Sequence, residues 1–175
     1  FGEKSHPWLQ KKHTIEMRVK ESQDSSKMIG VKKTMFFGME EGKFPKEITE
    51  RDIEKKMCTL IKKYKPTIIF THATDDPHPD HRAVASFTME LAKKIRHPAH
   101  IYAFEVWNVV NLSKRDVPKL YIDISDTFSL KCRALKCFKS QKIAMFSLMW
   151  SVYWRAIRCG NQAGCKFAEV FYKVQ

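Results

Sequence analysis

The chain has 175 residues, of which 43% are hydrophobic and 29% are charged, so it is long enough for one globular domain with a sizeable core. We therefore expect a single domain over residues 1–175. The formal net charge of +13 raises nucleic acid or an acidic membrane as a partner, but the lysines are spread over several expected helices. We expect a solvated basic surface and no dedicated nucleic-acid partner.

The sequence also bears on the compartment. No apolar run reaches the length of a membrane span, and residues 1–4 lack the apolar segment of a signal peptide. The five cysteines show no C-x-x-C spacing, and their odd number suits a reducing compartment. These features predict a cytoplasmic chain with no membrane span and no disulfide.

The first half of the chain alternates between helical and extended patterns. Gly30 supplies the stop of a polar helix, and Thr49 with Asp52 has the spacing of a capping box before a clean apolar face. Two short apolar runs read as buried strands. The expected elements are a helix over 13–28, a strand over 34–37, a helix over 53–64 and a strand over 67–70. Strand, helix and strand in this order predict a βαβ unit and a parallel sheet.

The second half continues the alternation. Val84, Phe87, Leu91 and Ile95 form the apolar stripe of a helix that starts at Pro79. The remaining expected elements are strands over 100–107, 119–124 and 167–174 and helices over 126–140 and 143–157. The fold class that follows is α/β, a Rossmann-like three-layer sandwich with a mostly parallel sheet.

Residues 71–81 carry most of the chemistry of the chain. This stretch, Thr-His-Ala-Thr-Asp-Asp-Pro-His-Pro-Asp-His, holds three histidines and three aspartates between an expected strand and an expected helix. Ligand sites of open α/β sheets lie at that junction. A lone histidine is more often packed or solvated, but His-x-x-His flanked by aspartates favours a metal or catalytic site. A catalytic zinc needs three protein ligands plus water, so at least one ligand must come from elsewhere.

With these residues assembled, the chain resembles the LmbE-like/PIG-L family of zinc-dependent N-deacetylases, which remove acetyl groups from N-acetylglucosamine-type sugars. The resemblance extends over almost the whole chain in the expected order. Its segments are Phe70-Thr71-His72, Asp76-Pro77-His78-Pro79-Asp80-His81-Arg82-Ala83-Val84, Arg18-x-x-Glu21, Ile29-Gly30-Val31, Lys131-x-x-Ala134-Leu135, Ser140-Gln141, Arg155-Ala156, Gly160 and Ala168-Glu169-x-Phe171.

The resemblance implies a role for each candidate residue. His81 is the expected metal ligand, for zinc or another divalent ion. His78 is the expected catalytic histidine, with Asp80 holding its ring. Asp76 and His72 are expected to support the site from behind the ligands, although His72 equally suits the plain end of a strand. Arg18 is expected near the substrate or, with equal weight, as a surface arginine.

The family pattern begins with a strand and an Ala-His-Pro-Asp-Asp-Glu motif, which this sequence does not contain. We therefore expect a family member without its first strand, first metal motif and first helix, with the remaining ligands and the catalytic base in that segment. The predicted activity is hydrolysis of an N-acetylated sugar, anionic or neutral, by zinc-bound water. The alternative is a non-catalytic sugar-binding remnant. A homo-oligomer is left open.

Overall fold

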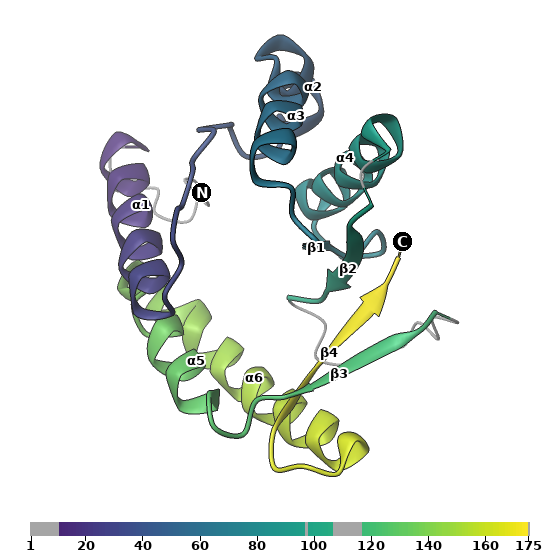
Figure 1. Cartoon of the computed structure of the whole chain (residues 1–175). Coiled ribbons are helices and arrows are strands. Elements are labelled where there is room, and N and C mark those ends of the chain that lie inside the picture. Colours follow the sequence, from purple (N-terminus) through teal and green to yellow (C-terminus); the bar gives the residue numbers. More distant parts are fainter. Residues whose placement is uncertain (1–10, 97, 107–116, 175) are drawn as a thin grey trace. The chain divides into compact units, whose positions relative to one another are not determined.

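The computed structural model describes residues 11–96, 98–106 and 117–174, and this part of the chain has an α/β fold with six α-helices and four strands (Figure 1). In chain order the elements are α1 (Lys11–Met28), α2 (Phe44–Glu50), α3 (Ile53–Tyr64), β1 (Ile68–His72), α4 (Pro79–Ile95), β2 (His100–Phe104), β3 (Lys119–Asp123), α5 (Phe128–Leu135), the short 3₁₀ helix η2 (Lys139–Gln141), α6 (Lys142–Ala163) and β4 (Ala168–Lys173). The expected strand over 100–107 ends at Phe104, and Trp107 lies outside the described residues.

The chain divides into two compact units, which we describe separately. The first comprises Phe1–Gly38 and Ile122–Glu169, and the second comprises Met39–Tyr121 and Val170–Gln175. The single domain over 1–175 stays a prediction. All of the His-rich loop belongs to the second unit.

The sheet is mixed, which corrects the expectation of a mostly parallel one. Its strand order is β1-β2-β4-β3, with β1 parallel to β2 and β2 antiparallel to β4. A strand's sequence pattern carries its burial but not its direction, so the reversal at β4 could not be read from residues 167–174. The expected buried strand at 67–70 exists, yet Ile68 and Phe70 are about half exposed, because they project from the face of β1 opposite the one that Thr71 turns toward α4.

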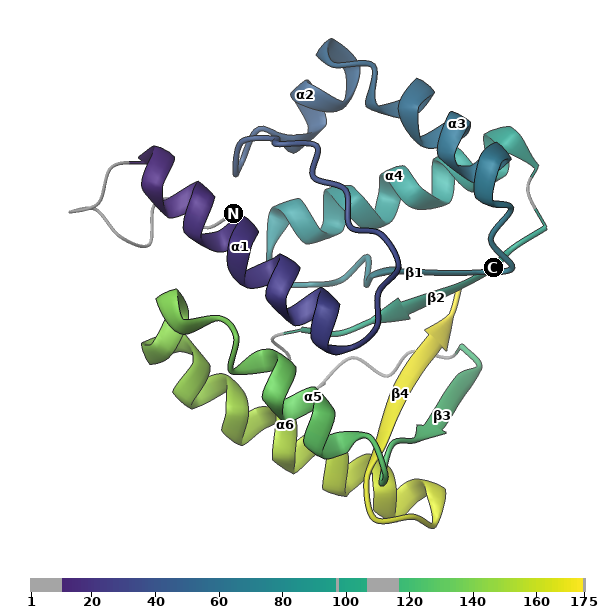
Figure 2. The same ribbon diagram turned by 60° about the vertical axis from the view of Figure 1, so that its left-hand side comes forward.

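The expected βαβ unit is also wrong in its position. Residues 34–37 form no strand, and Met35 is 42% exposed. An apolar run becomes a strand only where a neighbour completes its backbone hydrogen bonds, and no described strand lies beside this run. The parallel pair is instead β1 and β2, joined by α4, which packs along β1 (Figure 2).

Small and apolar side chains position α4 against the sheet. Ala85, Leu91 and Ala92 are buried, and the hydroxyls of Thr88 and Thr71 lie 3.2 Å apart across the contact between α4 and β1. The expected stripe residue Phe87 is only half-buried and contacts Phe44 of α2 edge to face. The closely packed face therefore uses alanines where larger residues were expected, which brings the first turn of α4 close to the end of β1.

The expected capping box before α3 does not form. Thr49 lies inside α2, a short helix that the sequence reading does not include, and Asp52 adopts a left-handed conformation (φ 51°) without a side-chain cap. Within α3, Ile53 and Ile61 are buried as expected, whereas Tyr64 is 52% exposed. Asp52 thus serves as the junction between two helices and not as the cap of one.

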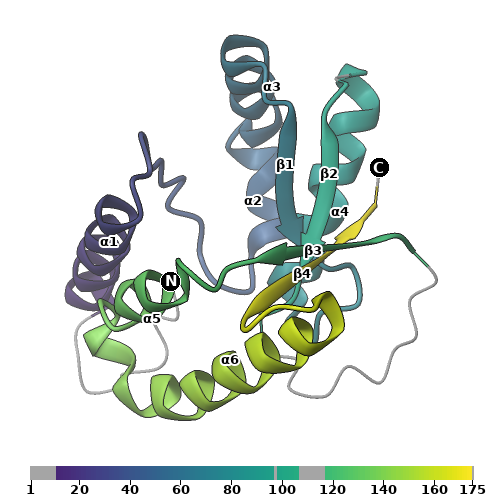
Figure 3. The same cartoon turned by 60° about the horizontal axis from the view of Figure 1, so that its bottom comes forward.

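The first unit contains α1, α5 and α6, and α5 and α6 lie side by side in Figure 2 and Figure 3. Its core joins Ile124, Phe128, Cys132 and Ala156, and the ring of Phe167 stacks on Phe128 at 4.1 Å. No described helix is both long and apolar enough to cross a membrane. All five cysteines are free thiols.

Gly160, near the end of α6, has the loop that leads into β4 folded tightly against it. The backbone N–H of Cys165 donates to its carbonyl oxygen at 2.9 Å. A Cβ atom at position 160 would lie 2.6 Å from the carbonyl oxygen of Cys165 and 2.7 Å from that of Lys166. Backbone cannot yield at such distances, so this contact requires glycine.

Candidate metal centre

The His-rich loop occupies the junction between the end of β1 and the first turn of α4. Pro79 begins α4, where its missing N–H costs nothing, and His78 caps the helix by accepting a hydrogen bond from the N–H of Asp80 at 3.2 Å. The guanidinium of Arg82 donates to the carbonyl oxygens of Asp76 and Pro77 at 2.7 and 2.9 Å. These local contacts hold the loop in a tight turn, so its polar side chains are gathered at one place.

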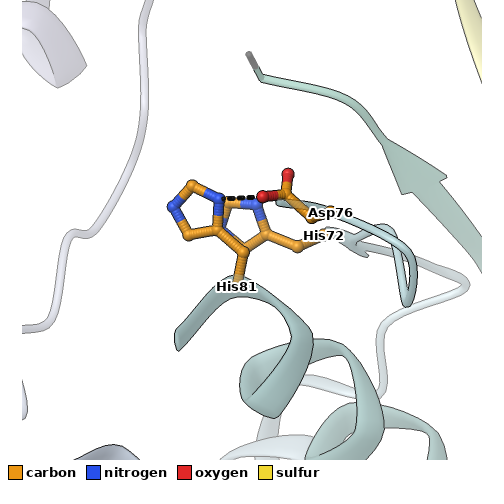
Figure 4. A group of neighbouring side chains, drawn as sticks. All are labelled: His72, Asp76 and His81. Carbon is orange, nitrogen blue, oxygen red and sulfur yellow. Dashed lines mark hydrogen bonds and ion pairs between the residues drawn. The ribbon is translucent and has the colours of Figure 1, made fainter. Parts of the chain in front are cut away.

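Three side chains converge there: His72 from the end of β1, Asp76 from the loop and His81 from α4 (Figure 4). One ligand atom from each lies within 4.8 Å of the others. The rings of His72 and His81 stack at 3.9 Å with an angle of 6° between their planes. A carboxylate oxygen of Asp76 lies 3.0 Å from Nδ1 of His81. The same oxygen accepts the backbone N–H of His78 at 2.9 Å.

The electrostatics of the cluster favour a neutral His72 ring. Burial, and then the neighbouring His81 ring, lower the pKa of His72 from 6.5 to about 4, while Asp76 acts in the opposite sense. His72 is therefore neutral at pH 7, with a lone pair available. Its Nδ1 atom is buried and has no hydrogen-bond partner among the described residues. A buried polar atom left without a partner costs about 1–3 kcal/mol, so this cluster is incomplete as it stands.

The donor set fits a divalent metal ion. Two imidazoles and one carboxylate are ligands that zinc and other divalent transition metals accept. Asp76 is only 4% exposed, and a buried carboxylate needs an opposite charge or hydrogen bonds beside it. Sequence reasoning places the ligands other than His81 in a segment that the chain does not contain. The described residues nevertheless bring two further donors to His81, and both were expected only as supporting residues.

His78 lies at the rim of this cluster, with its ring 4.7 Å from that of His81. Because its Nδ1 accepts the N–H of Asp80, the neutral ring carries its proton on Nε2, and Nε2 lies 3.8 Å from a carboxylate oxygen of Glu41. The Asp80 carboxylate was expected to hold this ring. The carboxylate instead accepts the backbone N–H of Gly42 at 2.9 Å. Asp80 contacts the ring of His78 through its backbone N–H.

Glu41 is a further acid beside the His-rich loop, in a Glu-Gly pair whose sequence interpretation favours a plain turn. Residues 40–43 form a turn, in which the N–H of Lys43 donates to the carbonyl oxygen of Glu40 at 3.1 Å and Gly42 has φ 80°. A turn alone explains a Glu-Gly pair, so the sequence carries no signal for the contact with His78. The other carboxylate oxygen of Glu41 is buried without a partner in the described part of the chain. The turn therefore both reverses the chain and presents an acid to the His-rich loop.

Arg18 lies on α1 in the first unit, and its role near a substrate stays a prediction. It is 8% exposed, so it is not the surface arginine of the alternative interpretation. Its neighbour Glu21, also 8% exposed, accepts the backbone N–H and the hydroxyl of Ser140, both at 2.7 Å. The structure thus brings together His72, Asp76, His78, Asp80 and His81, whereas Arg18 belongs to the other unit.

Comparison with known proteins gives the family. The family described as PIG-L, GlcNAc-PI de-N-acetylase, matches residues 1–92, which is more than half of the chain. The chain belongs to the PIG-L family. The diacetylchitobiose deacetylase of Thermococcus kodakarensis is 26% identical over 167 residues, which cover 87% of this chain and 60% of that protein. The PIG-L chain described here thus spans about 60% of the length of this curated relative.

Solved structures show the same fold. The N,N'-diacetylchitobiose deacetylase of Pyrococcus horikoshii, determined with an inhibitor, matches 95% of this chain and 66% of its own, with a TM-score of 0.72 and 20% identity. The 4-carboxy-2-hydroxymuconate hydratase GalB of Pseudomonas putida KT2440 matches 100% of this chain and 81% of its own, with a TM-score of 0.74 and 16% identity. A hydratase and a deacetylase share this fold, so the fold alone does not choose the reaction of a PIG-L chain.

Proposed function

We propose that this chain is a metal-dependent N-deacetylase that hydrolyses the acetamide of an N-acetylglucosamine-type sugar. The observation that carries the proposal is the convergence of His72, Asp76 and His81, with a neutral His72 whose buried Nδ1 lacks a partner. Family membership and the diacetylchitobiose deacetylase relative supply the substrate class. The hydratase with the same fold is the reason that the reaction needs a direct test.

The metal would be held by His81 together with His72 and Asp76. Zinc suits two imidazoles and a carboxylate, and selection among divalent ions in a cell also depends on their supply. When bound, such an ion polarises an amide carbonyl and activates water for attack. If Asp76 and His81 hold the same ion, the ion would take the place of the proton in the 3.0 Å contact between the Asp76 oxygen and Nδ1 of His81.

His78 is the proposed acid of the reaction. Its Nε2 carries a proton and lies at the rim of the cluster, within 3.8 Å of Glu41. As an imidazolium, the ring would give its Nε2 proton to the leaving amine and be left as a neutral imidazole, because an amide nitrogen must be protonated before it departs. That form requires the hydrogen bond from the N–H of Asp80 to Nδ1 to open. The carboxylate of Glu41 would orient the ring and stabilise its positively charged form. Asp80 would act indirectly, because its carboxylate holds the turn at Gly42 that places Glu41 beside the ring of His78.

Paired histidine variants test the proposal. The readouts are bound zinc per chain and acetate released from N,N'-diacetylchitobiose. We expect His81→Ala to lose the metal and the activity together, by more than about 100-fold. His78→Ala should keep the metal and lose roughly 10²–10⁴-fold in turnover. The exposed His13 supplies the matched control, since His13→Ala should change neither quantity.

Two outcomes would contradict this assignment. Retained zinc and retained activity in His81→Ala would remove the metal centre from the reaction. Stoichiometric zinc and saturable sugar binding without any acetate release, in the wild-type chain, would replace the enzyme with the sugar-binding alternative.

A further inference from the structure

The outer face of α6 presents large apolar side chains to solvent. Trp150, Trp154 and Ile157 are 71%, 37% and 46% exposed, and we call these three residues the aromatic stripe. Their spacing of three, four and seven residues places them on one side of the helix. The opposite side packs in the core of the first unit through Ala156. A helix that is apolar on both sides normally buries both, so the exposed side of α6 is suited to contact a partner surface.

The segment that contains the stripe is strongly basic, although its Lys131 pairs with Glu169 just beyond the end of the segment. Between Thr127 and Ala168 the chain has eight basic residues and no acidic residue: Lys131, Arg133, Lys136, Lys139, Lys142, Arg155, Arg158 and Lys166. This segment therefore contains most of the net charge of +13. The guanidinium of Arg158 lies over the ring of Trp154 at 4.9 Å. Basic and aromatic groups are thus combined on α6 itself.

We propose that the aromatic stripe of α6, together with the basic residues of the segment that runs from α5 through α6, docks on an anionic lipid surface. Tryptophan rings settle at the level of lipid headgroups, where one edge is apolar and the other is wet. Basic side chains beside them are attracted by anionic headgroups, and helices with this combination lie in the plane of the interface. Nothing in this argument rests on the deacetylase activity.

Other occupants fit the face less well. A second copy of the chain would bring this basic segment against the same segment, so like charges oppose that contact. A single-stranded nucleic acid would need open ring faces for its bases. One face of Trp154 is already covered by Arg158, and Ile157 offers no ring. An anionic bilayer accepts the aliphatic residue, the ring edges and the basic groups together.

Vesicle flotation with the full chain tests the proposal. We expect binding to phosphatidylcholine vesicles with about 30% phosphatidylserine and little binding to phosphatidylcholine alone. Trp150→Ala with Ile157→Ala should weaken the partition at least about 10-fold. Lys136→Gln with Lys139→Gln, both at exposed positions, should weaken it roughly 5-fold per charge removed. The matched control is Tyr64→Ala with Ile29→Ala, which removes an aromatic and an aliphatic residue that are 52% and 50% exposed elsewhere.

Each remaining outcome overturns the proposal, provided that far-UV circular dichroism shows every variant folded. Absence of binding to the anionic vesicles does so, and so does equal binding by Trp150→Ala with Ile157→Ala. Binding of single-stranded polyuridylate that this double variant abolishes, without vesicle binding, would assign the face to nucleic acid. A dimer in sedimentation velocity that the double variant disperses, again without vesicle binding, would assign it to a second copy.

Discussion

Two buried carboxylates, one in each unit, differ in how completely they are satisfied. Glu21 in α1 accepts two hydrogen bonds from Ser140, one at each of its oxygens, and both are 2.7 Å long. Asp76 in the His-rich loop shares one oxygen between the N–H of His78 and the ring of His81. Beside it lies the Nδ1 of His72, which has no partner among the described residues.

The difference separates a structural polar group from a functional one. A closed set of charged hydrogen bonds fixes two segments far apart in the sequence, here α1 and η2, and offers nothing to a ligand. An open set costs stability in the folded chain and recovers that cost when a cation enters. Removing Glu21 should therefore cost folding stability, and removing Asp76 should cost metal binding. The following predictions test this contrast in order of decreasing effect.

The largest effect is expected for Asp76→Asn. The substitution keeps the shape of the side chain but removes its charge, so the affinity for zinc should fall by about 100–1000-fold. Competition with a chromophoric chelator measures the change. The exposed neighbour Asp75 supplies the control, since Asp75→Asn should alter the affinity less than about 3-fold. Equal losses in the two variants would show that the overall charge of the loop matters and not the position of Asp76.

The next effect is expected for Glu21→Ala. The loss of two charged hydrogen bonds leaves Ser140 without its acceptors and should lower the free energy of unfolding by about 2–4 kcal/mol. Urea denaturation gives the value, and Glu16→Ala on the exposed side of the same helix is the control. Zinc affinity should stay the same. A weakened zinc site in Glu21→Ala would mean that the two carboxylates are coupled and the contrast fails.

A smaller effect is expected from the ionisation of His72 in metal-free protein. Its pKa of about 4 lies below the ordinary 6.5, so between these values the unfolded chain binds the extra proton. Stability should therefore be nearly complete above about pH 6.5 and fall by about 1–2 kcal/mol as the pH approaches 4, less than the full shift would give because the ring is partly open to solvent. His72→Phe should lose that slope, while His100→Phe, at an exposed position, should keep it. Identical slopes in wild type and His72→Phe would exclude His72 as the source.

The smallest effect is expected for Asp80→Ala. Its carboxylate accepts the N–H of Gly42 at a site open to solvent and lies in the first turn of α4, near the positive end of the helix dipole. The free energy of unfolding should fall by about 1 kcal/mol. The exposed Glu90→Ala on the same helix is the matched control. A loss above about 3 kcal/mol would place Asp80 with the buried carboxylates.

The sequence could predict the parts of the site that are set locally. His78, Asp80 and His81 fall within one turn of a helix start, where Pro79 and a cap fix the backbone whatever lies around them. Their gathering at the end of β1 follows from the strand–loop–helix order alone. The structure confirms that order, and the match to the PIG-L family covers it.

Contacts that depend on distant residues could not be predicted in the same way. Glu41 lies 37 residues before His78, and a Glu-Gly turn has the same sequence with or without that contact. Residues 34–37 have the composition of a strand, but whether they pair depends on the rest of the sheet. The buried contact between Glu21 and Ser140 spans 119 residues, and nothing near α1 indicates it.

The tight approach at Gly160 sets a rule for reading related sequences. Carbonyl oxygens at 2.6 and 2.7 Å from its missing Cβ leave no room for even a methyl group, and backbone at both sides prevents relief. A relative with any side chain at this position must leave α6 along another path and enter its last strand from elsewhere. In an alignment, the residue at position 160 thus indicates whether a relative keeps this connection between α6 and its last strand.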